Sequence, residues 1–149
     1  MFDSEETLVR AFDAALLEEN SPFSPDCIAM EFDYREGRTD LIISDVQGNL
    51  IAFEMKLEKW KQALHQAYRN SSFAHYSYVV LPSRTAQKAA KLEQEFLRRG
   101  VGLCSVEGTK IRIEINARRA EPLRPWLTES AIEYLYGGES CLVRHAFKI

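Results

Sequence analysis

Apolar residues recur with two different periods along this chain, and each change of period marks an expected boundary between a helix and a strand. The first period is helical, and it runs over Leu8, Val9, Phe12, Ala15 and Leu16. Asp3 followed by Glu6 has the form of a capping box at its start. The prolines at positions 22 and 25 forbid a continued helix, so we expect this one to end near Asn20.

A period of two over the next segment, with Ile28, Met30 and Phe32 alternating with polar or small residues, predicts a half-buried strand, and two apolar strands follow it after short turns. The strands cover residues 27–34, 39–44 and 50–56, with turns at 35–37 and around Gly48. Because the connections are short, we expect these strands to pair as an antiparallel meander.

The helical period returns over residues 57–70 and precedes a strand at 76–81 that stops at Pro82. A helix that leads from one strand to the next implies a crossover and parallel pairing. A further helix at 84–99 ends at Gly100 and leads to a buried strand at 101–106. The alternation of apolar and charged residues over 110–115 predicts one more strand, at an edge or in a hairpin.

These elements predict an α/β fold with the order α-β-β-β-α-β-α-β and a mixed central sheet of four or five strands. Residues 1–116 form this core. Residues 117–149 form a short C-terminal extension, with a helix from Thr128 to about Tyr136, which packs on the core or mediates dimerisation.

Three charged residues stand at the ends of two otherwise apolar strands: Asp40 on 39–44, and Glu54 and Lys56 on 50–56. Glu54 and Lys56 are two positions apart on a strand, so they point to the same face. Two carboxylates bind a hard divalent cation such as Mg²⁺, and a nearby ammonium orients a water molecule and offsets developing charge. This pattern favours the hydrolysis of a phosphodiester.

The Asp40 and Glu54-Met55-Lys56 elements, followed by an amphipathic helix, resemble the PD-(D/E)XK nuclease superfamily, which has the restriction-endonuclease-like fold. The resemblance runs from about Glu5 to Val106, and Thr39 stands where the family often has proline. It implies a Mg²⁺ or Mn²⁺ ion between Asp40, Glu54 and the backbone carbonyl of Met55.

Two branches of the superfamily extend the expected site. Glu5 resembles a first-helix glutamate that joins the metal site in branches like the archaeal Holliday-junction resolvases; the alternative is that it only favours the helix N-terminus. Gln66 and Tyr68 resemble the Gln-and-Tyr helix of RecB-like branches. The glutamine lies one residue closer to the tyrosine than in those branches, which leaves Gln62 as an alternative. Glu31 is a rival candidate for the first acid of the site.

Basic residues near the same helix are expected to contact nucleic-acid phosphates. Lys59 and Arg69 are the main candidates, with Tyr68 as a third contact. The formal net charge of −3 gives no overall attraction to nucleic acid, so a DNA surface must be local.

Composition indicates a cytoplasmic protein that is not attached to a membrane. No apolar run approaches the ~20 residues that span a bilayer, and the N-terminus is acidic where a signal peptide would be basic. The three cysteines, Cys27, Cys104 and Cys141, are odd in number and fit no zinc motif, so we expect reduced thiols.

These observations favour a metal-dependent nuclease that hydrolyses phosphodiester bonds of DNA. The intact Asp40, Glu54 and Lys56 set is the main reason. The alternative is a catalytically inactive, nuclease-like module that binds nucleic acid or protein. The negative net charge and the lack of an evident specificity domain favour that alternative.

Overall fold

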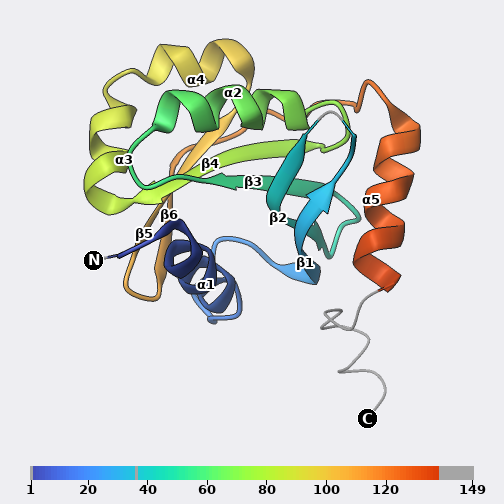
Figure 1. Ribbon diagram of the computed structural model, residues 1–149, viewed down its shortest axis with the longest axis horizontal. Helices are drawn as coiled ribbons and strands as arrows, with labels where there is room; N and C mark the ends of the chain where they lie inside the picture. Colours follow the sequence, from blue (N-terminus) through green and yellow to red (C-terminus); the bar gives the residue numbers. More distant parts are fainter. Residues whose placement is uncertain (1, 36, 138–149) are drawn as a thin grey trace.

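The computed structural model describes residues 2–35 and 37–137 as one mixed sheet with helices on both faces (Figure 1). The elements in chain order are α1 (Glu5–Leu16), β1 (Pro25–Asp33), β2 (Arg38–Asp45), β3 (Leu50–Met55), α2 (Trp60–Asn70), β4 (Tyr76–Pro82), α3 (Ser83–Ala90), α4 (Glu93–Arg99), β5 (Gly102–Glu107), β6 (Lys110–Ile115) and α5 (Pro125–Gly137).

The sheet has the strand order β1-β2-β3-β4-β5-β6. β1, β2 and β3 are antiparallel neighbours, β3, β4 and β5 are parallel, and β6 is antiparallel to β5. The predicted meander and crossover are therefore confirmed. The expected count of four or five strands is too low, because β6 joins the sheet through a hairpin with Gly108 at its turn. The φ of Gly108 is 61°, a left-handed conformation that glycine adopts without strain.

The helices cover the sheet from both sides. α1 lies on one face, whereas α2, α3 and α4 lie on the other (Figure 1). Phe12 of α1 packs against Phe53 of β3, with 4.8 Å between the ring centroids. On the opposite face, Ala63 and Ala67 of α2 belong to the same buried cluster as Val79 of β4. Both faces of the parallel strands are thus excluded from water, which explains their nearly unbroken apolar sequences.

The C-terminal helix α5 packs beside the antiparallel edge of the sheet, against β1 and β2 (Figure 1). Ala131 and Leu135 are its buried residues. The hydroxyl group of Tyr134 donates a 2.6 Å hydrogen bond to the carbonyl oxygen of Met30 in β1. The helix begins at Pro125, three residues before the predicted start.

The first helix begins with a different cap from the one expected. The hydroxyl oxygen of Ser4, rather than the carboxylate of Asp3, accepts the backbone N–H of Thr7 at 3.2 Å. The Thr7 hydroxyl oxygen in turn accepts the backbone N–H of Ser4, and Glu6 pairs with Arg10. The prediction of an Asp3–Glu6 capping box is wrong because a Ser-x-x-Thr pair one position later closes the same reciprocal hydrogen bonds. The helix also ends earlier than Asn20, at Leu16.

The helix expected over 84–99 is two helices, α3 and α4, which lie at an angle to each other (Figure 1). The last turn of α3 tightens, because the N–H groups of Lys91 and Leu92 donate to carbonyls three residues back. Leu92 then leaves the helical conformation, with φ −108° and ψ 43°. The hydrophobic period continues through this break, which is why the sequence did not reveal it.

The cysteine prediction is correct in part. Cys104 is a buried free thiol. Cys27 is disulfide-bonded, so the expected reduced thiol is wrong there; an odd cysteine count does not decide which thiols pair. Cys141 lies outside the described residues. Within residues 2–35 and 37–137, no helix is both long and apolar enough to cross a membrane.

Candidate functional site

Asp40 and Glu54 are brought together where β2 and β3 separate. The register pairs Leu41 with Phe53, so Asp40 and Glu54 are the next residues across from each other. The ladder between the two strands stops there, and the Oδ2 atom of Asp40 accepts the backbone N–H of Met55 at 2.9 Å. A hydrogen bond also joins the two carboxyl groups. Two acids and one backbone segment therefore meet at one point of the sheet.

Both carboxyl groups have raised pKa values. Burial, and then the charge of Asp40, raise the pKa of Glu54 to about 8, and only 2% of this residue is exposed. Burial also raises the pKa of Asp40, against the opposing effects of the Met55 N–H and the Lys56 charge. A half-buried and a buried carboxylate that are hydrogen-bonded to each other repel when both are charged, so Glu54, whose pKa is the one raised to about 8, holds a proton at pH 7.

The Glu54 carboxyl group is held by a buried amide that the sequence analysis did not identify. The Nδ2 atom of Asn70, the last residue of α2, donates to the Oε2 atom of Glu54 at 2.7 Å. The Oδ1 atom of Asn70 accepts the hydroxyl groups of Tyr34 at 2.6 Å and Thr39 at 3.0 Å. Asn70 is 1% exposed, and Thr39 is fully buried. The sequence did not indicate that Asn70 contacts Glu54, because a polar residue is common at the end of a helix, where it acts as a cap.

Lys56 directly follows β3, and its Nζ atom lies 3.7 Å from the Oε1 atom of Glu5. Its side chain is 20% exposed and that of Glu5 is 51% exposed. The lysine charge also acts on both acids, because it lowers the pKa of Asp40 and that of Glu54. Lys56 therefore lies between the carboxyl pair and the N-terminus of α1. Glu5 is not buried with Leu8 and Phe12 as its helical spacing predicts, because it lies in the first turn, beyond the edge of the core.

A cavity of about 510 Å³ opens beside the pair, between α1 and the β1–β2 hairpin. Its lining residues are Glu5, Glu6, Val9, Arg10, Met30, Glu31 and Asp40. Glu31 is thus placed at the site. It is exposed, and within the described part of the chain its carboxylate makes no hydrogen bond or ion pair. The φ of Glu31 is 56°, a left-handed conformation that is uncommon for a residue with a side chain. The sequence left Glu5 and Glu31 as alternatives, and the structure places both on this cavity.

The donor set at this point fits a hard divalent cation. Carboxylate and carbonyl oxygens are the ligands of Mg²⁺ and Mn²⁺, and Mg²⁺ is commonly bound through one or two carboxylates with water at the remaining positions. Asp40 and Glu54 supply the carboxylates. The pKa of Glu54 is raised because its negative charge is unfavourable beside that of Asp40, and a cation would compensate both charges. In the described part of the chain, no group of three or more His, Cys, Asp or Glu side chains is arranged around a metal position.

The predicted residues of α2 are divided between two environments. Gln66 is partly buried, and its Oε1 atom has no hydrogen-bond partner. Gln62 is exposed. Lys59 precedes the helix and is exposed, as are Tyr68 and Arg69. Tyr68 lines a second, smaller cavity that shares no residue with the first. Tyr68 therefore lies at a different cavity from Asp40. Contact of Lys59, Tyr68 and Arg69 with nucleic acid stays a prediction.

Comparisons with known proteins give structural similarity only. No protein-family model matches the chain, and no curated protein matches its sequence. The SPO1766 protein of unknown function from Silicibacter pomeroyi has a TM-score of 0.55 and 16% identity, over 74% of this chain and 71% of that one. A chain of an EndoMS–dsDNA complex has a TM-score of 0.51 and 17% identity, over 74% of this chain and 47% of that one.

A repair endonuclease from Pyrococcus abyssi has a TM-score of 0.45 and 19% identity, over 72% of this chain and 49% of that one. The present chain thus spans about half the length of the EndoMS and repair-endonuclease chains. At these identities the similarity establishes the fold and leaves the activity open. The mixed six-stranded sheet with its flanking helices is a restriction-endonuclease-like fold, as the sequence predicted.

Proposed function

We propose that this protein is a metal-dependent nuclease of the PD-(D/E)XK type that hydrolyses phosphodiester bonds of DNA. The observation that supports the proposal most is the hydrogen-bonded Asp40–Glu54 pair beside an open cavity, with Lys56 next to it. Packing alone does not account for this arrangement, because a buried acid pair costs free energy unless something compensates its charge.

Asp40, Glu54 and the backbone carbonyl of Met55 are the residues that would hold Mg²⁺ or Mn²⁺. When bound, such an ion polarises the phosphate and lowers the pKa of a coordinated water molecule. The protein residues position the reacting groups. Asn70 fixes one oxygen of Glu54, and the Met55 N–H fixes one oxygen of Asp40, so the other oxygen of each group would be the ligand of the cation.

Lys56 supplies a positive charge beside the carboxyl pair. In the proposed reaction its ammonium group orients the attacking water and stabilises the charge that develops on the phosphate. Glu5, whose Oε1 atom lies 3.7 Å from the lysine Nζ atom, holds the lysine in place and would be a further or water-mediated ligand of the ion. The unpartnered Oε1 atom of Gln66 is a further acceptor for a bound water or nucleotide.

The direct test is cleavage of a panel of nucleic acids by the purified protein. Single-stranded, duplex and branched DNA, together with RNA, are incubated with Mg²⁺ or Mn²⁺. We expect cleavage by the wild type and loss of cleavage in Asp40→Asn and Glu54→Gln. Lys110→Ala, which removes an exposed lysine of β6 far along the chain from the pair, is the control and should cleave as the wild type does.

The same assay separates the nuclease from an inactive binding module. If the wild type binds DNA but cuts no substrate with either metal, the nuclease proposal is wrong and the binding module takes its place. If Asp40→Asn cuts as fast as the wild type, the activity does not arise from this site. Homodimerisation remains a prediction, and light scattering on the eluting protein tests it.

A further inference from the structure

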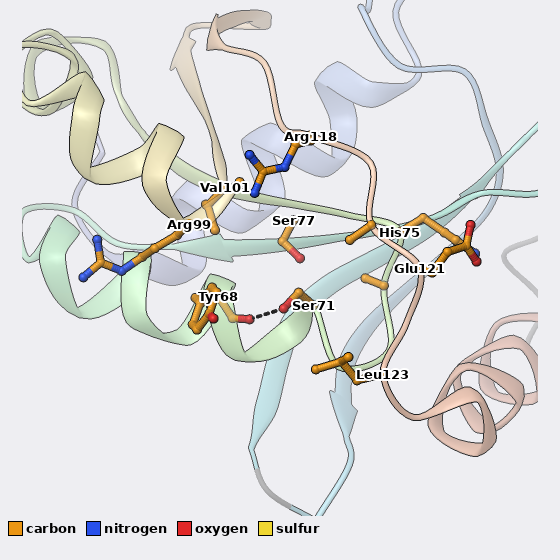
Figure 2. A pocket seen from close by; sticks show the side chains of 12 residues that line it. Tyr68, Ser71, His75, Ser77, Arg99, Val101, Arg118, Glu121 and Leu123 are labelled. Carbon is orange, nitrogen blue, oxygen red and sulfur yellow. Dashed lines mark hydrogen bonds between the residues drawn. The ribbon is translucent and has the colours of Figure 1, made fainter.

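A second cavity, of about 200 Å³, lies on the face of the sheet that carries α2 and α4 (Figure 2). It is bounded by the C-terminal end of α2, the start of β4, the turn from α4 to β5, and the segment that follows β6. No residue of this cavity lines the larger one beside the carboxyl pair. The nuclease proposal therefore gives it no role.

Backbone hydrogen bonds hold the segment after β6 in place along the cavity. The N–H of Arg118 donates to the carbonyl oxygen of Gly100 at 3.0 Å, and the N–H of Ala120 donates to that of His75 at 2.9 Å. The N–H of Arg124 donates to the carbonyl oxygen of Ser72 at 2.9 Å. These three bonds connect the segment to the turn between α4 and β5 and, twice, to the loop between α2 and β4. The wall of the cavity is thus a fixed part of the fold.

Ser77 places a hydroxyl group at the base of this cavity. The residue is 4% exposed, and its Oγ atom has no hydrogen-bond partner. Figure 2 shows the side chain pointing into the space between Arg118 and Ser71. A buried hydroxyl group without a hydrogen-bond partner costs free energy, so we expect this atom to bind a ligand or a water molecule.

Arg118 lies above Ser77 and against Gly100. A Cβ atom at position 100 would come within 3.1 Å of the Arg118 guanidinium, so the guanidinium packs closely against this glycine. The φ of Gly100 is 71°, a left-handed conformation that favours glycine. Within the described part of the chain, the guanidinium group makes no hydrogen bond or ion pair. Arg99, on the same rim, already forms an ion pair, because its Nη1 atom lies 3.2 Å from the Oε1 atom of Glu95. Arg118 is therefore the charge that this cavity offers to a ligand.

The other polar groups at the cavity also leave donors available. The Nδ1 atom of His75 accepts the N–H of Leu50 at 3.0 Å, which places the ring hydrogen on Nε2. Burial, and then the charge of Arg119, lower the pKa of His75, so the ring is neutral at pH 7. The carboxylate of Glu121 pairs with Arg119. The cavity thus offers a guanidinium and a hydroxyl group, while the carboxylate of Glu121, its one acidic side chain, is already paired.

We propose that this cavity binds a phosphate group, with Arg118 and Ser77 as its principal donors. A phosphate has several acceptor oxygens and negative charge, which match donors that have no acceptor of their own. The volume of about 200 Å³ accommodates a phosphate group. Tyr68, half-exposed at the rim, supplies an aromatic face beside the phosphate for the sugar or base of a nucleotide.

Titration of the metal-free protein with inorganic phosphate, followed by NMR at constant ionic strength, tests this site. We expect chemical-shift changes at the amides of Ser77 and Gly100. Arg118→Gln should weaken the apparent affinity about tenfold or more, and Ser77→Ala about threefold to tenfold. Arg112→Gln, which removes an exposed arginine of β6 outside the cavity, is the matched control and should bind as the wild type does.

To identify the source of the phosphate, the same titration is repeated with adenosine 5′-monophosphate and with adenosine, and the affinities are compared with that for inorganic phosphate. Tighter binding of the nucleotide than of inorganic phosphate, with the difference lost in Tyr68→Ala, identifies a nucleotide phosphate. Equal binding of the two identifies free phosphate at the same site. The proposal is overturned if phosphate causes no shift at Ser77, or if Arg118→Gln binds as the wild type does. Glu54→Gln should bind phosphate normally, so this result is independent of cleavage.

Discussion

The side-chain amide of Asn70 donates a 2.7 Å hydrogen bond to Glu54, and this contact joins the end of α2 to the acid pair. The orientation of the amide is determined, because the hydroxyl groups of Tyr34 and Thr39 both donate to its oxygen. The NH₂ group must then face Glu54. Asn70 is thus a positioning residue for the acid that holds the proton.

Asn70→Ala is expected to destabilise the fold by about 2–4 kcal/mol, because it leaves three buried polar groups without their partner. Tyr34→Phe removes a single donor from the same amide, so it should cost about 1 kcal/mol. Urea unfolding measures the loss of free energy of unfolding in each variant. Equal losses in the two variants would show that the amide does not organise the network.

The stability of the metal-free protein is expected to fall as the pH rises from about 4.5 to about 8. The pKa of Glu54 is raised on folding to about 8, so in this range the folded protein holds a proton that the unfolded chain releases. Its contribution to stability is complete at the low end of the range and is lost at the high end. Melting temperatures across this range should decline by several degrees in the wild type and stay flatter in Glu54→Gln.

Mg²⁺ should raise the melting temperature more at pH 8 than at pH 6, because the cation competes with the Glu54 proton for the same carboxylates. The measurement is a thermal melt at each pH with and without Mg²⁺. Asp40→Asn should lose most of the increase. An increase of the same size in wild type and Asp40→Asn would place the binding of Mg²⁺ elsewhere.

Lys56→Ala is expected to reduce single-turnover cleavage by about 10²-fold or more while leaving metal binding intact. Lys56→Arg should not restore cleavage, since a guanidinium is larger and planar and cannot replace a compact ammonium group. Glu5→Gln should have a much smaller effect, because an ion pair at 3.7 Å with a half-exposed partner contributes about 0.2–1 kcal/mol. A loss in Glu5→Gln as large as that in Lys56→Ala would instead identify Glu5 as a member of the metal site.

Gln66→Ala is expected to lower cleavage without lowering stability, because the Oε1 atom of Gln66 has no partner to lose. Gln62→Ala, on an exposed position of the same helix, should change neither property. Cleavage rates and melting temperatures of the two variants decide between the two glutamines. An effect on cleavage in Gln62→Ala alone would reverse the assignment.

Gly102→Ala should destabilise the fold by about 3 kcal/mol or more. The added methyl group would lie 2.3 Å from the Tyr78 ring and 2.6 Å from the backbone nitrogen of Ala117. Gly137→Ala is the matched control, since no atom lies within 4 Å of its added methyl group. The free energy of unfolding of each variant, measured with urea, should separate them clearly.

The elements of this protein follow from local sequence, because a strand or helix shows its own period in a few consecutive residues. The apolar runs at 39–44 and 50–56, with a short turn between them, were enough to place Asp40 and Glu54 on neighbouring strands. The helix at 57–70, between two strands, was enough to predict parallel pairing of β3 with β4. The break between α3 and α4 escaped detection, because both helices continue the same hydrophobic period.

The network around the acids was decided only by the tertiary structure. Asn70 reaches Glu54 because α2 folds back along the sheet, and no local pattern records which buried amide will meet which acid. The same holds for the ion pair between Lys56 and Glu5, and for Arg118 lying against Gly100. Periodicity specifies which face of an element is buried. The partners of an individual polar group depend on distances between elements that are remote in the chain, and packing of the whole core sets those distances.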